Sequence, residues 1–241
     1  MRLPEIITRE IQAIDKLYLA LRQEAADAED DPAIRLTIAD FAKRKQLLLE
    51  ELSQSLISNN RHSLQYVFKT NQEKLEVKML SGNLSSLSRL IDHQLGRATR
   101  GKQKHLPIYL NTVFSGSFGV QLSTPTESKF LDQDFEKAVG STIDTLNELA
   151  TTPDDQVSAL VKQVFSNDVA LLNHFSSLLK NMASTGEDVE IRWRSPVTET
   201  IKSVSVTPAK ATQLRLVFAD HATTEEVTTR RGVVKGVSLL N

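Results

Sequence analysis

Two amphipathic stretches at the start of the chain decide its fold: PEIITREIQAIDKLYLAL at residues 4–21 and PAIRLTIADFAKRKQLLLEELSQSL at residues 32–56. Apolar side chains recur in both at spacings of three and four residues, which is the period of one helix face. The two stripes consist of Ile7, Ile11, Ile14, Tyr18 and Leu21, and of Ile34, Ile38, Phe41, Lys45, Leu48, Leu52 and Leu56. We therefore expect two long helices with facing stripes.

A short polar segment between these stretches predicts an antiparallel helical hairpin over residues 1–59. Asp31-Pro32 is typical of a helix cap followed by a first-turn proline. Two helices joined by a short turn pack antiparallel. The stripes are nearly heptad-like, so a coiled-coil arm is one interpretation, and packing against the rest of the chain is another. Lys45 falls within the second stripe and weakens a fully buried seam.

Alternating polarity predicts two β-hairpins, near residues 63–80 and 106–124, with a helix over residues 85–99 between them. The first hairpin would pair the run around Tyr66 with the run around Val77. In the second, a loop of Ser115-Gly116-Ser117 would place residue 114 opposite 118, 112 opposite 120, and 110 opposite 122. The shared face would then consist of Leu110, Phe114, Phe118, Val120 and Leu122.

The second half of the chain predicts three helices and then strands. The helices fall within residues 130–184, and the third begins at Asn167 or Asp168. Strands are expected at residues 189–194 and 201–206. Residues 207–218 stay open, because Thr207-Pro208 indicates a helix cap while the apolar residues that follow alternate as in a strand. A final strand over residues 232–240 would pair inside the sheet, or the natural chain continues beyond Asn241.

Helices and strands arrive in groups rather than in regular alternation. This order predicts an α+β fold with mainly antiparallel strands, not a doubly wound sheet. We expect a helical hairpin arm over residues 1–59, an α+β core over residues 60–187 and a mostly β segment over residues 188–241. The last segment would pack with the core as one domain or stand beside it.

The composition excludes several classes of protein. The chain contains no cysteine, so disulfides, thiolate nucleophiles, iron–sulfur clusters and cysteine-ligated zinc are ruled out. Charged residues interrupt the N-terminus where a signal peptide needs an apolar run, and no stretch is apolar enough to span a membrane. We therefore expect a soluble, cytoplasmic protein without membrane contact. No motif indicates a cofactor, and the five histidines show no metal-binding spacing.

A basic segment is the first candidate site. Residues 60–125 carry nine basic and three acidic residues, and residues 126–187 carry four basic and ten acidic ones. No acidic residue occurs between Asp92 and Glu127. Arg97, Arg100, Lys102 and Lys104 would therefore form a basic loop that neutralises the phosphates of DNA or RNA. Alternatively, the basic and acidic blocks attract one another within the fold.

Glu76 and Lys78 form a second candidate site. Side chains two residues apart on a strand share one face, where a carboxylate holds a divalent metal and a lysine stabilises developing negative charge, as in metal-dependent nucleases. Such a site needs a further carboxylate, and neither Asp40 nor Asp92 fits well. An exposed ion pair on the solvent face of a strand is the structural alternative.

Three functions follow from these patterns. The first is a non-catalytic interaction or regulatory protein, whose helical hairpin binds a protein partner or a second copy of the chain. The second is a nucleic-acid-binding accessory protein that uses the basic loop at residues 97–105. The third is a nuclease that uses Glu76 and Lys78. The first is favoured, because two amphipathic stripes are present and no catalytic signature is.

Overall fold

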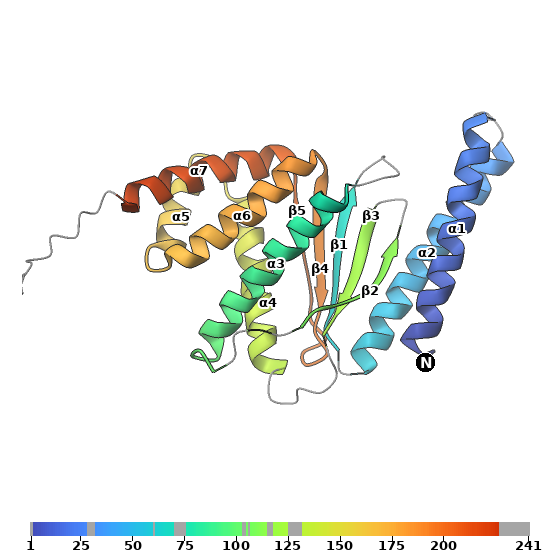
Figure 1. The fold of residues 1–241 in the computed structure, drawn as a ribbon, viewed down its shortest axis with the longest axis horizontal. Helices are drawn as coiled ribbons and strands as arrows, with labels where there is room; N and C mark the ends of the chain where they lie inside the picture. The colour runs from blue at the N-terminus through green and yellow to red at the C-terminus, as the bar shows by residue number, and fades with distance from the viewer. Residues whose placement is uncertain are drawn as a thin grey trace, which may run out of the picture.

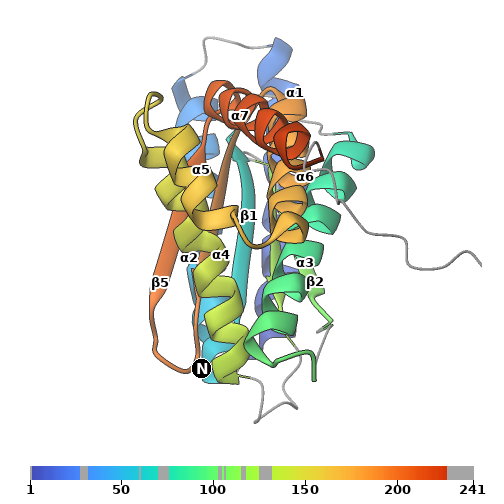
Figure 2. The same cartoon turned by 90° about the vertical axis from the view of Figure 1, so that its left-hand side faces the viewer.

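A central antiparallel sheet separates the N-terminal helical hairpin from the other helices (Figures 1 and 2). The computed structural model describes residues 2–27, 32–59, 61–69, 76–102, 105, 107–114, 118–124 and 132–226. The elements are α1 (Pro4–Asp27), α2 (Pro32–Ser58), β1 (Ser63–Lys69), α3 (Val77–Ala98), β2 (Tyr109–Phe114), β3 (Phe118–Ser123), α4 (Asp132–Thr151), α5 (Val157–Phe165), α6 (Val169–Thr185), β4 (Asp188–Arg194), β5 (Ile201–Val206) and α7 (Pro208–Glu226). The predicted α+β class is confirmed, as is the N-terminal helical pair.

The sheet has the order β2-β3-β1-β4-β5, and every neighbouring pair is antiparallel. β1 lies at its centre, because it pairs with β3 on one side and with β4 on the other. The strands of residues 188–206 therefore belong to the same sheet as those of residues 63–123. Helices α3 to α7 lie on one side of this sheet and the arm of α1 and α2 on the other (Figure 1).

Two apolar clusters hold these layers together. The larger one joins the alternate strand residues that face α3 to α7, such as Tyr66, Ile191 and Trp193, to the buried stripes of those helices. The smaller one joins α1 and α2 to Phe114 and Val67 on the opposite face of the sheet. Each strand thus alternates between two buried environments where the arm covers it, as the strand period of two requires.

The arm is joined across its seam by a buried ion pair. Lys45 Nζ lies 3.0 Å from Asp15 Oδ1, and their side chains are 8% and 12% exposed. Lys45 Nζ also lies 4.9 Å from the centre of the Tyr18 ring, within range of a cation–π contact. Lys45 therefore belongs to the buried stripe because α1 supplies a counter-ion, so it does not interrupt the seam.

The prediction of a β-hairpin near residues 63–80 is wrong for its second strand. β1 is present, but residues 77–98 form α3, so the run around Val77 is helical. The short alternation there is the beginning of a helical stripe that continues through Leu87, Leu90, Ile91 and Leu95, all of which are buried. Three alternating residues do not distinguish a strand from a helix start when the helix stripe follows directly.

The hairpin at 106–124 is confirmed, with a changed register. Leu110 pairs with Leu122 as expected, but a bulge at Asn111 then shifts the pairing by one residue, so that Thr112 lies opposite Gln121 and Phe114 opposite Gly119. A bulge adds one residue to one strand and reverses the faces beyond it. Phe114 therefore points to the arm, not to the face it was expected to share with Leu122. The loop at 115–117 lies outside the described residues.

The C-terminal segment is β only in its first part. β4 and β5 are confirmed, and residues 208–226 form α7, which settles the open segment as a helix. Thr207 Oγ1 accepts a hydrogen bond from the backbone N–H of Lys210 at 3.2 Å, as an N-cap does. Leu214 and Phe218 are buried one turn apart, whereas Leu216 is exposed. The strand expected over residues 232–240 lies outside the described residues.

Replacing Lys45 by alanine tests the buried ion pair. Because the change leaves the Asp15 carboxylate buried without its cation, we expect the free energy of unfolding to fall by about 3 kcal/mol. The exposed neighbour Lys43→Ala is the matched control, expected to change it by less than about 0.5 kcal/mol. The double variant Asp15→Leu/Lys45→Met should recover most of the loss in urea unfolding. Equal effects of Lys43→Ala and Lys45→Ala would contradict this account.

Candidate functional site

The basic segment lies where α3 ends, and the structure places acidic partners beside part of it. Arg97 Nη1 lies 3.2 Å from Asp168 Oδ2, and His105 Nδ1 lies 2.8 Å from Asp92 Oδ2. Arg100 and Lys102 are exposed, and Arg100 has a backbone φ of 53°. Lys104 lies outside the described residues. The structure therefore brings Arg97 to a carboxylate of the acidic block and leaves two cations at the surface.

Asp168 links the ends of two helices. It is the N-cap of α6, where its side chain accepts a hydrogen bond from the N–H of Leu171. His93 Nε2 lies 3.0 Å from Asp168 Oδ2. Burial raises the pKa of Asp168, but hydrogen bonds from His93 and Leu171 and the charges of His93 and Arg97 outweigh it, so the pKa is lowered. This carboxylate thus acts as a structural anion that neutralises part of the basic segment.

Glu76 and Lys78 do not share the face of a strand. Glu76 is the N-cap of α3, and Lys78 lies in the first turn of that helix. Both side chains are exposed. Among the described residues, no three histidine, aspartate or glutamate side chains are grouped so that they would hold a metal ion. The nuclease hypothesis required Glu76 and Lys78 on one face of a strand, and the structure places them at the start of a helix instead.

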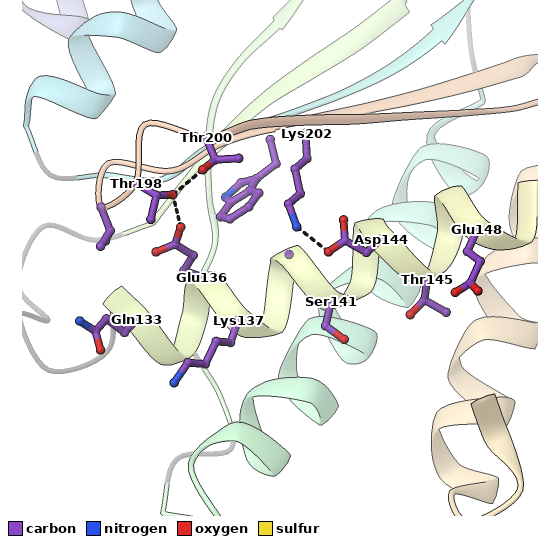
Figure 3. A pocket seen from close by; sticks show the side chains of 13 residues that line it. Gln133, Glu136, Lys137, Ser141, Asp144, Thr145, Glu148, Thr198, Thr200 and Lys202 are labelled. Atoms are coloured by element: carbon purple, nitrogen blue, oxygen red, sulfur yellow. Dashed lines mark hydrogen bonds and ion pairs between the residues drawn. The ribbon is translucent and has the colours of Figure 1, made fainter. Parts of the chain in front are cut away.

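A groove of about 750 Å³ runs between α4 and the turn that joins β4 to β5 (Figure 3). Gly140 opens it from the helix side, because a Cβ there would lie 3.4 Å from Lys202 Nζ and 3.7 Å from the Trp193 ring. Lys202 pairs with Asp144 across the groove. The rest of the lining consists of the apolar Val197 and of polar residues of both charge signs: Gln133, Glu136, Lys137, Ser141, Thr145, Glu148, Thr198 and Thr200.

Five of the polar side chains that line this groove are paired with one another. Thr198 donates a hydrogen bond to Glu136 and accepts one from Thr200 at 2.7 Å (Figure 3). With Lys202 paired to Asp144, these contacts tie α4 to the β4–β5 turn. Trp193 lies against the floor but is only 1% exposed, so its ring is not offered for stacking. These contacts stabilise the packing of α4 on β5.

His62 is buried behind the groove floor without a polar partner. It is 2% exposed, its ring centre lies 4.7 Å from that of Phe135 and 5.8 Å from that of Trp193, and neither ring nitrogen makes a hydrogen bond to a described residue. A cavity of about 10 Å³ beside it has barely room for one water molecule. Burial lowers the pKa of His62 to about 4.

The arm carries a second, exposed apolar surface, which we call the outer arm face. It is formed by Leu3, directly before α1, by Ile6, Glu10, Ala13 and Leu17 of α1, and by Ala33, Thr37, Asp40, Arg44 and Leu47 of α2. Leu17 is 54% exposed and Leu47 is 64% exposed. A groove of about 400 Å³ between the helices is lined by Ala13, Ile14, Leu17 and Phe41, with Arg2, Glu10 and Arg44 at its rim.

Comparisons with known proteins give no information on the function of this chain. No protein-family model, curated protein or solved structure matches this chain. In the part of the chain that the structure describes, no helix is long and apolar enough to span a membrane. The charged and apolar surfaces described above are therefore the basis for a functional proposal.

Sequence reasoning missed the outer arm face, although the sequence contains a signal for it. Leu3, Ile6, Ala13 and Leu17 recur at spacings of three, seven and four residues beside the buried stripe of α1, so they form a second, partly apolar face that Glu10 interrupts. The groove beside α4 had no such signal. Its two walls are about sixty residues apart in sequence, as the hydrogen bond between Thr198 and Glu136 shows.

The buried His62 gives a test through pH. Between about pH 6.5 and its folded-state pKa of about 4, His62 stays neutral when folded and binds a proton when unfolded, so stability falls as the pH is lowered. We expect a loss approaching 3 kcal/mol at about pH 4. Urea unfolding of the wild type and of His62→Leu across this range isolates the effect, since all other groups are shared. Parallel stability curves would contradict it.

Proposed function

We propose that this chain is a non-catalytic interaction protein that binds another protein chain on its outer arm face. The observation that carries the proposal is the exposure of large apolar side chains along one side of the helical pair. Contiguous exposed apolar surface rimmed by charged groups is typical of protein interaction sites. A helix pair that already buries one stripe against itself presents such a second stripe for a partner helix.

The position of the arm supports this proposal. Its distal half, where α1 approaches its end and α2 begins, rises beyond the end of the sheet (Figure 1). In α2 the residues that the structure buries begin at Lys45, and Ile34, Ile38 and Phe41 before it are only half-buried. The distal arm is thus accessible to a partner, and its seam has apolar surface still to be covered.

The other hypotheses have weaker support. A nucleic-acid site in the basic segment would lose the cation that Asp168 engages, and it would keep Arg100 and Lys102 as exposed charges. Isolated exposed cations are common on protein surfaces and specify no ligand. In the groove beside α4, five polar side chains are paired across it. The outer arm face combines exposed leucines with a groove, which is the surface chemistry that a protein partner would bind.

Site-specific photo-crosslinking in the source cell tests the proposal. With a photoreactive phenylalanine in place of Leu17, we expect covalent adducts to protein, because the outer arm face is covered in the cell. The matched control carries the same group in place of Leu216, a leucine of α7 that is 56% exposed, almost as exposed as Leu17. Adducts at 17 that disappear with Leu47→Glu support the proposal. A chain that yields equal adducts at both positions, or none at 17, argues against it.

A further inference from the structure

Arg2 bounds one end of the groove in the outer arm face. Arg2 bridges the two helices, with Nη1 2.6 Å from Glu10 Oε1 and Nε 2.7 Å from Glu51 Oε1. The open groove therefore begins above Arg2, at Ala13, and continues past Leu17 and Phe41. A partner must therefore fit the part of the outer arm face between Ala13 and Phe41, which we call the upper outer arm face.

Two opposite charges stand on α2 beside the open groove. Asp40 and Arg44 are four residues apart, so they lie on the same side of the helix. That spacing would allow an ion pair within the helix, but neither side chain has an ion-pair or hydrogen-bond partner among the described residues. Both are exposed, on the face that also carries Leu47. Each of them is available to a charge of opposite sign on a partner.

This pattern is self-complementary when two copies of α2 run antiparallel. If a two-fold axis passes between Asp40 and Arg44, each aspartate lies opposite the arginine of the other copy, and two equivalent ion pairs form. The same operation places Leu47 opposite Thr37 of the second copy. An isologous interface requires such reciprocity, in which residue i meets residue j and residue j meets residue i.

The packing of α1 against α2 brings a leucine to the same axis. The ion pair between Asp15 and Lys45 sets these two residues at one level of the arm. Because the helices are antiparallel, the centre of the Asp40–Arg44 segment lies about three residues further along α1, next to Leu17. Leu17 would then pack near its symmetry mate. Ala13, one turn away, leaves room for close approach of the second helix.

We propose that two copies of this chain pair through the upper outer arm face in an antiparallel four-helix arrangement, with Asp40 of each copy opposite Arg44 of the other. This inference rests on the proposed function and names the partner. The two sheets would lie at opposite ends and on opposite sides of the paired arms, because each arm carries its sheet on the reverse face (Figure 1). Ile34, Ile38 and Phe41 would gain cover on formation of the pair.

Charge reversal and charge exchange test the register. Sedimentation equilibrium would compare the full chain with Asp40→Arg, with Arg44→Asp and with the variant that carries both. Each single change appears twice across the axis and places like charges opposite one another, so we expect the dimer dissociation constant to rise by about tenfold or more. The double variant exchanges the charges and should return to within about threefold of the wild type.

Lys180→Asp, an exposed charge reversal on α6, is the matched control and should leave the dimer unchanged. Circular dichroism confirms that each variant is folded. A wild-type monomer overturns the inference, and so does a dimer that neither single variant weakens or that the double variant fails to restore. If the chain is a monomer but the photoreactive group at position 17 links it to a protein of another mass, the inference fails while the proposed function stands.

Discussion

The ion pair between Asp15 and Lys45 is the constraint on which the arm depends. Both groups lie in an apolar seam, where an unpaired charge would cost several kcal/mol, so the ion pair favours the register that brings them together. That register turns Ile7 and Ile11 inward, where they are fully buried. It turns Leu17 outward. The register that buries one face of each helix therefore leaves the outer arm face exposed. This exposed face is the surface that we propose binds a partner.

The sheet adapts to the arm through one irregularity. The bulge at Asn111 reverses the faces of β2 beyond it, so that Phe114 points toward the arm and joins its apolar cluster. The ring then crosses the opposite strand, where a Cβ on Gly119 would lie 2.4 Å from it. A residue with a side chain would not fit, and glycine fills this position because it has none. One extra residue in β2 thus supplies the aromatic anchor between sheet and arm.

Where a sequence pattern extended over several turns, it predicted the structure. The long stripes around Ile11 and Leu52 predicted the helical pair, and the cap at Asp168 predicted the start of α6. Short alternating patterns predicted β4 and β5, but they were wrong at residues 77–80 and left residues 207–218 open. Leu214 and Phe218 are four residues apart and buried on one helix face, while the intervening Leu216 only imitated strand alternation. The chemistry of the surfaces depends on distant pairs, such as Asp168 with Arg97, which no local pattern contains.

The most direct test of the outer arm face uses the absence of cysteine from the chain. A single cysteine at Leu17 would lie close to its counterpart if two arms pair, and a short bis-maleimide would then join the two chains. We expect a covalent dimer from Leu17→Cys and none from Leu216→Cys, which is exposed on α7. No cross-linked dimer from Leu17→Cys, or equal yields from the two positions, would contradict the pairing of two copies through the outer arm face.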